Sequence, residues 1–165
     1  MKNIIFIGMP ASGKSTVGVV VAKRLGYEFI DTDLLIQKQE KRLLKEIIAD
    51  VGNEGFLEIE NQVNRDVEAD RAVISPGGSV VYCQEAMEHF KTIGSVVYLK
   101  VSFETINRRI SNAKNRGVVL KEGQTLYDLY LERTKLFEKY ADYIVSEDGL
   151  ELEETIDKVL ELFEE

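Results

Sequence analysis

The stretch GMPASGKST, residues 8 to 16, follows directly on the apolar run NIIFI and contains the spacing Gly8-x4-Gly13-Lys14-Ser15. This spacing is typical of a phosphate-binding loop, in which successive backbone N–H groups point inward at phosphate oxygens. Lys14 would place a mobile positive charge at the β- and γ-phosphates, and the hydroxyl of Ser15 would bind Mg²⁺. We therefore expect ATP and Mg²⁺ at this loop. The expected contact residues are Gly8, Ala11, Ser12, Gly13, Lys14, Ser15 and Thr16.

Two aspartates, Asp31 and Asp33, follow the next strand-like segment of the chain, YEFI at 27–30. One carboxylate could reach Mg²⁺ beside Ser15, while the other orients an acceptor hydroxyl or takes its proton. Asp33 also precedes the apolar run 34–36 and could instead cap the N-terminus of a helix. The position at the end of a strand favours the chemical role, because ligands bind there in parallel sheets.

The segment Pro76-Gly77-Gly78-Ser79 follows a third strand-like run, AVIS at 72–75. These residues could form a simple turn. At the end of a strand, glycines also allow a ligand to approach the backbone closely. Both interpretations remain open, and the second makes Gly77 and Gly78 candidates for acceptor binding.

A polar segment at about 111–123 contains Arg116 and two lysines, and it follows Arg108 and Arg109. A loop with arginines can close over ATP, exclude water and stabilise the charge on a transferring phosphoryl group. The alternative is a solvated surface loop. We expect Arg116 to be the catalytic cation of this lid, with Arg109 or Arg108 assisting at the nucleotide.

Arg133 lies on a long predicted helix after the lid. It could face the acceptor. A surface arginine that pairs with Glu132 or Glu138 is nearly as good an interpretation.

Composition limits the class of protein. The formal net charge of −8 argues against nucleic acid as the main partner, because nucleic-acid-binding proteins present a basic face. No apolar run is long enough to span a bilayer, so no membrane partner is expected. The single cysteine, Cys83, and a strand-like start in place of a signal peptide favour the cytoplasm. The 165 residues predict one domain, 1–165, as a monomer or weak homo-oligomer.

Strands and helices alternate along the chain. The predicted strands are 3–7, 27–30, 72–75, 95–100 and 142–145. The predicted helices are 14–25, 34–50, 54–69, 84–92, 103–110, 125–140 and 151–163. This alternation predicts an α/β fold with a five-stranded parallel sheet covered by helices on both faces.

Missing motifs narrow the function. The third strand carries no terminal aspartate of the ATPase type, and no Asn-Lys-x-Asp appears for guanine recognition. A P-loop kinase remains. A nucleotide monophosphate would need arginines to bind its phosphate, and Arg42 is the only arginine in residues 34–64. A neutral or carboxylated small alcohol fits better as the acceptor.

With these residues in place, the sequence resembles the shikimate kinase family over nearly its whole length. The matching stretches are the phosphate loop, FIDTD (29–33), GNEGFLEIE (52–60), PGGSVV (76–81), NRG (115–117) and ERTKLFEKYAD (132–142). The resemblance implies a P-loop kinase fold with a lid and a helical acceptor-binding region, here at about 34–64. It also implies transfer of the γ-phosphoryl group of ATP to a hydroxyl of shikimate, with Mg²⁺.

The resemblance also assigns roles to residues. It implies that Asp31 lies near magnesium, and that Asp33 holds the acceptor hydroxyls and can act as base. The other matching positions are Gly77 and Gly78 of the acceptor loop, the acceptor-side Glu60, the lid arginine Arg116 and the carboxylate-binding Arg133.

The chain departs from the family pattern in its acceptor half. Leu57 stands where the family has an arginine that helps to hold the shikimate carboxylate, and this loss could cost roughly 1.5–3 kcal/mol of binding. Ser79 replaces the third glycine of the acceptor loop, Gly117 a lid proline, and Lys135 a proline after the carboxylate-binding arginine. Lys135 or Lys45 could supply the missing charge.

The sequence therefore predicts a phosphotransferase that moves the γ-phosphoryl group of ATP to a hydroxyl of a small metabolite, with shikimate the first candidate. An alternative acceptor is another hydroxy acid, a sugar acid or a hydroxy amino acid such as homoserine. An alternative of another class is a nucleotide-binding regulator that has lost catalysis.

Overall fold

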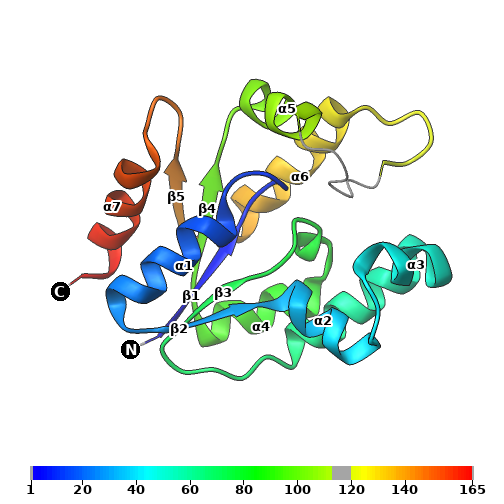
Figure 1. Ribbon diagram of the computed structural model, residues 1–165, viewed down its shortest axis with the longest axis horizontal. Coiled ribbons are helices and arrows are strands. Elements are labelled where there is room, and N and C mark those ends of the chain that lie inside the picture. The colour runs from blue at the N-terminus through cyan, green and yellow to red at the C-terminus, as the bar shows by residue number, and fades with distance from the viewer. Residues whose placement is uncertain (1, 113–119, 165) are drawn as a thin grey trace.

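Five parallel strands form the central sheet of the computed structural model, which describes residues 2–112 and 120–164. The strands are β1 (Asn3–Ile7), β2 (Glu28–Asp31), β3 (Ala72–Ser75), β4 (Gly94–Lys100) and β5 (Tyr143–Ser146). Their order across the sheet is β2-β3-β1-β4-β5, and all four pairings are parallel (Figure 1). The predicted five-stranded parallel sheet is confirmed, with each boundary within one residue of the expectation.

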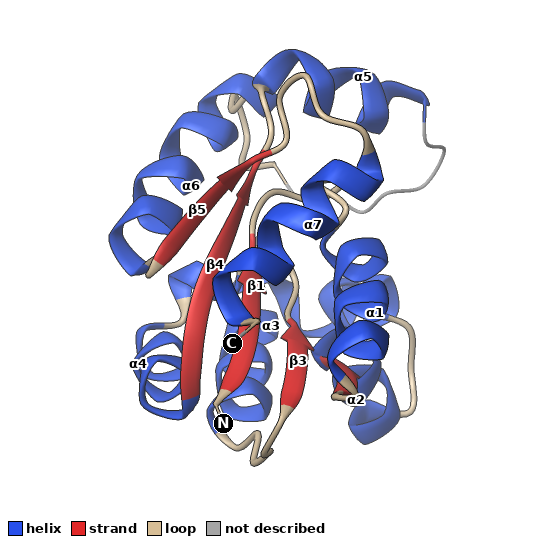
Figure 2. Cartoon of the chain, turned by 90° about the vertical axis from the view of Figure 1, so that its left-hand side faces the viewer, coloured by secondary structure: helices blue, strands red, loops and turns tan. Residues whose placement is uncertain are grey.

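Helices cover both faces of this sheet. On one face pack α1 (Lys14–Leu25) and α7 (Leu152–Phe163), and on the other pack α4 (Gln84–Ile93) and α6 (Leu126–Tyr140) (Figure 2). β1 shows why the sheet needs two layers, since successive side chains of a strand point to opposite faces. Ile4 and Phe6 join the core under α1 and α7, whereas Ile5 and Ile7 join the core under α4. A strand that is apolar at every position therefore has both faces buried.

Two helices after β2 form a separate lobe, to the right of the sheet in Figure 1. They are α2 (Thr32–Glu40) and α3 (Leu44–Arg65), and they share a small core of Ile36, Ile47, Phe56 and Val63. This lobe corresponds to the predicted acceptor-binding helices at about 34–64.

The prediction of one helix over 34–50 is wrong. α2 ends at Glu40 because Lys41 adopts a left-handed conformation, with φ 54°, and its N–H bonds the carbonyl of Gln37. α3 then begins at Leu44 and passes through a non-helical Gly52, with φ 75°, where the sequence predicts a break. It ends at Arg65 rather than at residue 69.

The chain between β4 and β5 carries α5 (Phe103–Asn112) before the predicted lid and α6 after it. Residues 113–119, which include Arg116 and Gly117, lie outside the described residues. A short 3-10 helix, η1 (Val80–Tyr82), follows the glycines after β3. In the described part of the chain, no helix is long and apolar enough to cross a membrane.

Candidate active site

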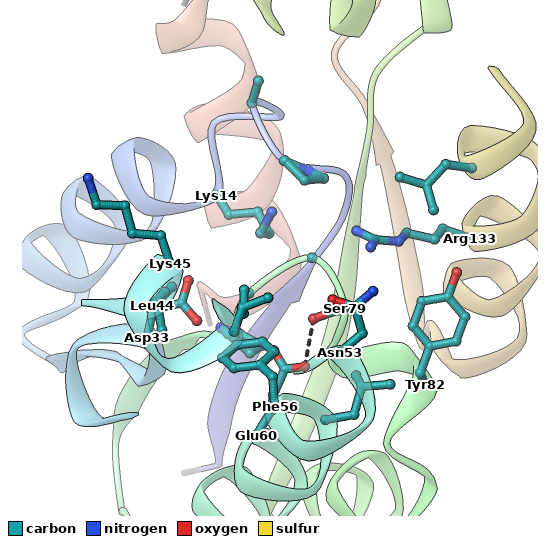
Figure 3. A pocket seen from close by; sticks show the side chains of 18 of the residues that line it. Lys14, Asp33, Leu44, Lys45, Asn53, Phe56, Glu60, Ser79, Tyr82 and Arg133 are labelled. Atoms are coloured by element: carbon teal, nitrogen blue, oxygen red, sulfur yellow. Dashed lines mark hydrogen bonds between the residues drawn. The ribbon is translucent and has the colours of Figure 1, made fainter. Parts of the chain in front are cut away.

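A cleft of about 1360 Å³ opens beyond the carboxyl ends of β1, β2 and β3. Its wall combines the phosphate loop, the start of α2, α3, the loop after β3 and α6 (Figure 3). The sequence-predicted residues that it brings together are Ala11, Gly13, Lys14, Ser15, Thr16, Asp31, Asp33, Glu60, Gly77, Gly78, Arg109 and Arg133. Segments more than 100 residues apart in the sequence therefore meet in one cleft, as the strand-end rule for α/β sheets predicts.

The loop between β1 and α1 has a shape that glycine makes possible. Gly13 is the N-cap of α1 and adopts φ 91°, and Ala11 adopts φ 68°. A Cβ atom added at Gly8 would lie 2.9 Å from the carbonyl oxygen of Leu99 and 3.0 Å from the Oγ of Ser12. The loop therefore curls tightly around the N-terminus of a helix, which is where backbone N–H groups bind anions.

Lys14 bridges the base of this loop. Its Nζ donates hydrogen bonds to the backbone carbonyls of Gly8 and Met9, both at 2.9 Å, and the residue is only 8% exposed. The Oγ of Ser12 is buried and has no hydrogen-bond partner among the described residues. A buried donor without a partner, next to a held ammonium group, fits an oxygen-rich anion such as a nucleotide phosphate.

Asp31 is the N-cap of α2, a role that the sequence analysis weighed for Asp33. Its Oδ1 accepts hydrogen bonds from the N–H groups of Asp33, at 2.9 Å, and Leu34, at 3.3 Å. Asp31 also lines the cleft, as does Ser15. No group of three or more His, Cys, Asp or Glu side chains forms a metal cage within the described residues. One carboxylate and one hydroxyl suit Mg²⁺, which binds few protein ligands and takes the rest from phosphates and water.

Asp33 lies in the first turn of α2 and faces the loop after β3. A Cβ atom at Gly77 would be 2.8 Å from its Oδ1 and 3.2 Å from its Oδ2. Burial and the neighbouring Asp31 raise the pKa of Asp33 to about 6, while the positive charge of Lys14 lowers it. A carboxylate with such a pKa is ionised at neutral pH and is a stronger base than an exposed aspartate.

Glu60 reaches the same glycine from α3. Its Oε2 would lie 3.2 Å from a Cβ atom at Gly77, and its Oε1 accepts a hydrogen bond of 2.6 Å from the Oγ of Ser79 (Figure 3). Burial raises the pKa of Glu60 to about 7, the Ser79 hydrogen bond lowers it, Asp33 raises it and Arg133 lowers it. The loop after β3 is therefore held between two acidic side chains.

Arg133 approaches the next residue of that loop from α6. It is 6% exposed, and its Nη1 would lie 3.1 Å from a Cβ atom at Gly78. Its guanidinium also lies over the ring of Tyr82, 5.5 Å from the centroid. The interpretation of Arg133 as a surface arginine is wrong, because α6 turns this side chain into the cleft. The segment does form a turn, in which the N–H of Val80 bonds the carbonyl of Gly77 at 3.3 Å, and side chains approach both glycines closely. Binding of the acceptor at Gly77 and Gly78 stays a prediction.

The arginines and lysines considered for the site differ in whether they line the cleft. Arg109 lines the cleft, and its Nη1 donates a hydrogen bond of 2.8 Å to the carbonyl of Ala11 in the phosphate loop. Lys45 lines the cleft, as Leu57 does, whereas Arg108 and Lys135 do not line it. Arg116 lies outside the described residues. Lys45 is thus the better placed of the two lysines that could replace the missing arginine charge.

Two residues of the site, Tyr82 and Glu147, were not predicted from the sequence, and Ser79 was noted there only as part of the acceptor loop. Tyr82 lines the cleft below Arg133, and Ser79 holds Glu60. Glu147, just after β5, brings its Oε1 to 3.7 Å from the Cβ position of Gly13, and burial raises its pKa to about 7. The run PGGSVVY contains a signal for Tyr82 and Ser79, since residues that follow a strand-end glycine pair enter the same cleft. Glu147 carries no local signal.

The raised pKa of Glu60 predicts a measurable effect on stability. Unfolded glutamate has a pKa of 4.5 and folded Glu60 one of about 7, so between these pH values the folded chain binds more protons. Its free energy of unfolding therefore falls as the pH rises from 4.5 to 7. Glu60→Gln cannot titrate, so this decrease in the free energy of unfolding is absent from the variant. The free energy of unfolding of the variant, relative to that of the natural chain, should therefore rise by up to about 3 kcal/mol from pH 5 to pH 8. Urea unfolding at both pH values measures the difference.

Glu58→Gln, at an exposed position of the same helix, is the matched control and should show no such trend. A Glu60→Gln variant whose relative stability is the same at pH 5 and pH 8 would show that Glu60 does not titrate in this range.

Several known proteins similar to this chain come from one family. A family model described as shikimate kinase matches residues 10–164. A shikimate kinase of Thermodesulfovibrio yellowstonii is 34% identical over 167 residues, covering 99% of this chain and 96% of the relative. One of Clostridium botulinum strain 657 is 39% identical over 143 residues, covering 84% of each. The solved structure of shikimate kinase from Acinetobacter baumannii in complex with shikimate superposes with a TM-score of 0.89, at 30% identity, over 98% of this chain and 92% of that one.

Proposed function

The chain belongs to the shikimate kinase family, and we propose that it transfers the γ-phosphoryl group of ATP to a hydroxyl of shikimate. One observation carries the proposal. The carboxylates of Asp33 and Glu60 border Gly77, and the buried guanidinium of Arg133 borders Gly78. This glycine pair lies directly beside the phosphate loop. An acceptor that carries hydroxyls at one end and a carboxylate at the other matches this arrangement.

The phosphate loop would hold the nucleotide. The N–H groups at the start of α1 would bind its phosphates, and Lys14 would move from the carbonyls of Gly8 and Met9 to the phosphoryl oxygens. Ser15 and Asp31 would hold Mg²⁺. When bound, Mg²⁺ neutralises part of the negative charge on the phosphoryl oxygens. Arg109 would lie at the outer side of the loop, where it already contacts Ala11.

The acceptor half would orient the substrate. Asp33 would bind the reacting hydroxyl and take its proton, because its carboxylate is ionised at neutral pH and borders the cleft. Arg133 would bind the acceptor carboxylate across Gly78. Arg116, outside the described residues, would complete the site from the lid. The protein would do little covalent work and mainly position the two substrates.

Other expectations from the sequence stay predictions. They are a single domain, a cytoplasmic setting, a monomer or weak homo-oligomer, and the absence of nucleic-acid and membrane partners. The acidic net charge of −8 supports the expectation about nucleic acid.

The experiment that tests the proposal measures ADP formation with ATP and Mg²⁺ during a titration of shikimate. We expect saturable, shikimate-dependent turnover. If Arg133 alone holds the carboxylate, the KM for shikimate should be high, since one charge-assisted hydrogen bond fewer weakens binding by about one to two decades. ATP binding without shikimate-dependent turnover would contradict shikimate as the acceptor.

One observation favours a second acceptor class. Leu57 lines the cleft at the position of the family arginine, so this part of the acceptor wall is apolar. A panel with homoserine and a sugar acid, read by the same ADP assay, distinguishes this possibility. ATP binding with no turnover on any acceptor would instead indicate a regulator that has lost catalysis.

A further inference from the structure

Glu60 has one carboxylate oxygen without a partner. The residue is 1% exposed, and its Oε2 makes no hydrogen bond with the described residues. A buried carboxylate oxygen costs free energy when it is left unpaired, so such an atom points to a donor other than the described residues. Glu60 also lines the cleft, so a ligand there can supply the donor.

Ser79 determines which oxygen of Glu60 is left over. Its hydroxyl donates to Oε1 at 2.6 Å, and the Sγ of Cys83 contacts the same oxygen at 4.0 Å. Oε1 is therefore occupied on the side of η1, and Oε2 is turned toward Gly77. Figure 3 shows the hydrogen bond from Ser79 to Glu60 in the middle of the cleft. Asp33 lies on one side of it and Arg133 on the other.

Gly77 places the free oxygen next to Asp33. A Cβ atom at this residue would lie 2.8 Å from the Oδ1 of Asp33 and 3.2 Å from the Oε2 of Glu60. Both carboxylates therefore border the same side of Gly77, where no side chain separates them. A diol that approaches this side can donate one hydroxyl to each carboxylate.

We propose that Ser79 is a positioning residue for acceptor specificity, because it fixes Glu60 so that Oε2 binds a second, non-reacting hydroxyl of the acceptor. The proposal rests on the proposed function. It defines the acceptor as a carboxylic acid with at least two hydroxyls, one for Asp33 and one for Glu60. A hydroxy acid with a single hydroxyl leaves Oε2 unpaired and binds more weakly.

Steady-state kinetics of Ser79 variants tests this role. Ser79→Ala should raise the KM for shikimate about tenfold, the effect of one hydrogen bond to a charged group, with the KM for ATP unchanged and kcat within about threefold. Ser79→Thr keeps the hydroxyl and should restore the KM. Thr92→Ala is the control, because the Thr92 hydroxyl also makes a 2.6 Å hydrogen bond, to the carbonyl of His89, but does not line the cleft.

Shikimate analogues that lack one non-reacting hydroxyl identify the partner of Oε2. One of them should already show the tenfold higher KM with the natural chain, and Ser79→Ala should add nothing for that analogue. If every such analogue is used as well as shikimate, a water rather than the acceptor satisfies Oε2, and the proposal is wrong. A Ser79→Ala effect that Thr does not rescue, or that raises the KM for ATP equally, also overturns it.

Two further outcomes are distinguishable. If the natural chain shows no shikimate-dependent turnover, the proposed function fails before Ser79 is tested. If Ser79→Ala does not fold, the analogue series on the natural chain still decides the role of Oε2.

Discussion

Replacing Lys14 with Met should lower kcat by about two to three orders of magnitude and leave the fold intact. Lys14 is the ammonium group at the base of the phosphate loop, bonded to two backbone carbonyls and 8% exposed. Its charge also lowers the pKa of Asp33, so its loss weakens the ionised form of the base. Methionine has a similar length and flexibility, so the variant removes the ammonium charge and its two hydrogen bonds to the carbonyls of Gly8 and Met9 while keeping most of the side-chain packing.

Lys23→Met is the matched control, because Lys23 lies exposed in the last turn of the same helix. The measurements are kcat, the KM for ATP and the midpoint of thermal unfolding for both variants. The control should match the natural chain in all three. A Lys14→Met variant with kcat within a few-fold of the natural value would remove the loop from the mechanism.

The sheet and the phosphate loop could be predicted because their signals are local. Apolar β-branched runs bounded by glycine predict buried strands, and the loop motif is confirmed by the strand before it and the helix after it. The break between α2 and α3 could not be predicted in this way. Lys41 adopts a left-handed conformation although no glycine, asparagine or proline nearby indicates it, and the core that α2 and α3 share on either side joins residues distant in sequence.

The acceptor site was harder to predict, because its contacts join distant segments. Ser79 lies nineteen positions after Glu60, and their hydrogen bond depends on how α3 packs against η1. Arg133 illustrates the same limit. The residues next to it in sequence are compatible both with a surface ion pair and with a buried side chain. Only the position of α6 against Gly78 decides between the two. Local pattern supplied the residue types, and tertiary packing supplied their partners.

Replacing Asp33 with Asn should lower kcat by about two to four orders of magnitude and change ATP binding much less. Asparagine keeps the size and the hydrogen-bonding oxygen of the side chain, but it cannot accept the proton of the acceptor hydroxyl. Asp31, not Asp33, caps α2, so the helix keeps its N-cap in this variant. The loss should therefore appear in catalysis rather than in folding.

Kinetics and direct ATP titration separate this prediction from that for Lys14. Lys14 and Asp33 face one cleft, but Lys14 belongs to the phosphate loop and Asp33 borders Gly77 on the acceptor side. Loss of Lys14 should thus weaken ATP binding as well as turnover, whereas loss of Asp33 should leave the ATP dissociation constant near its natural value. Asp157→Asn, on the exposed side of α7, is the control. An unchanged kcat in Asp33→Asn would mean that phosphoryl transfer here needs no side-chain base and rests on positioning by the loop and Arg133 alone.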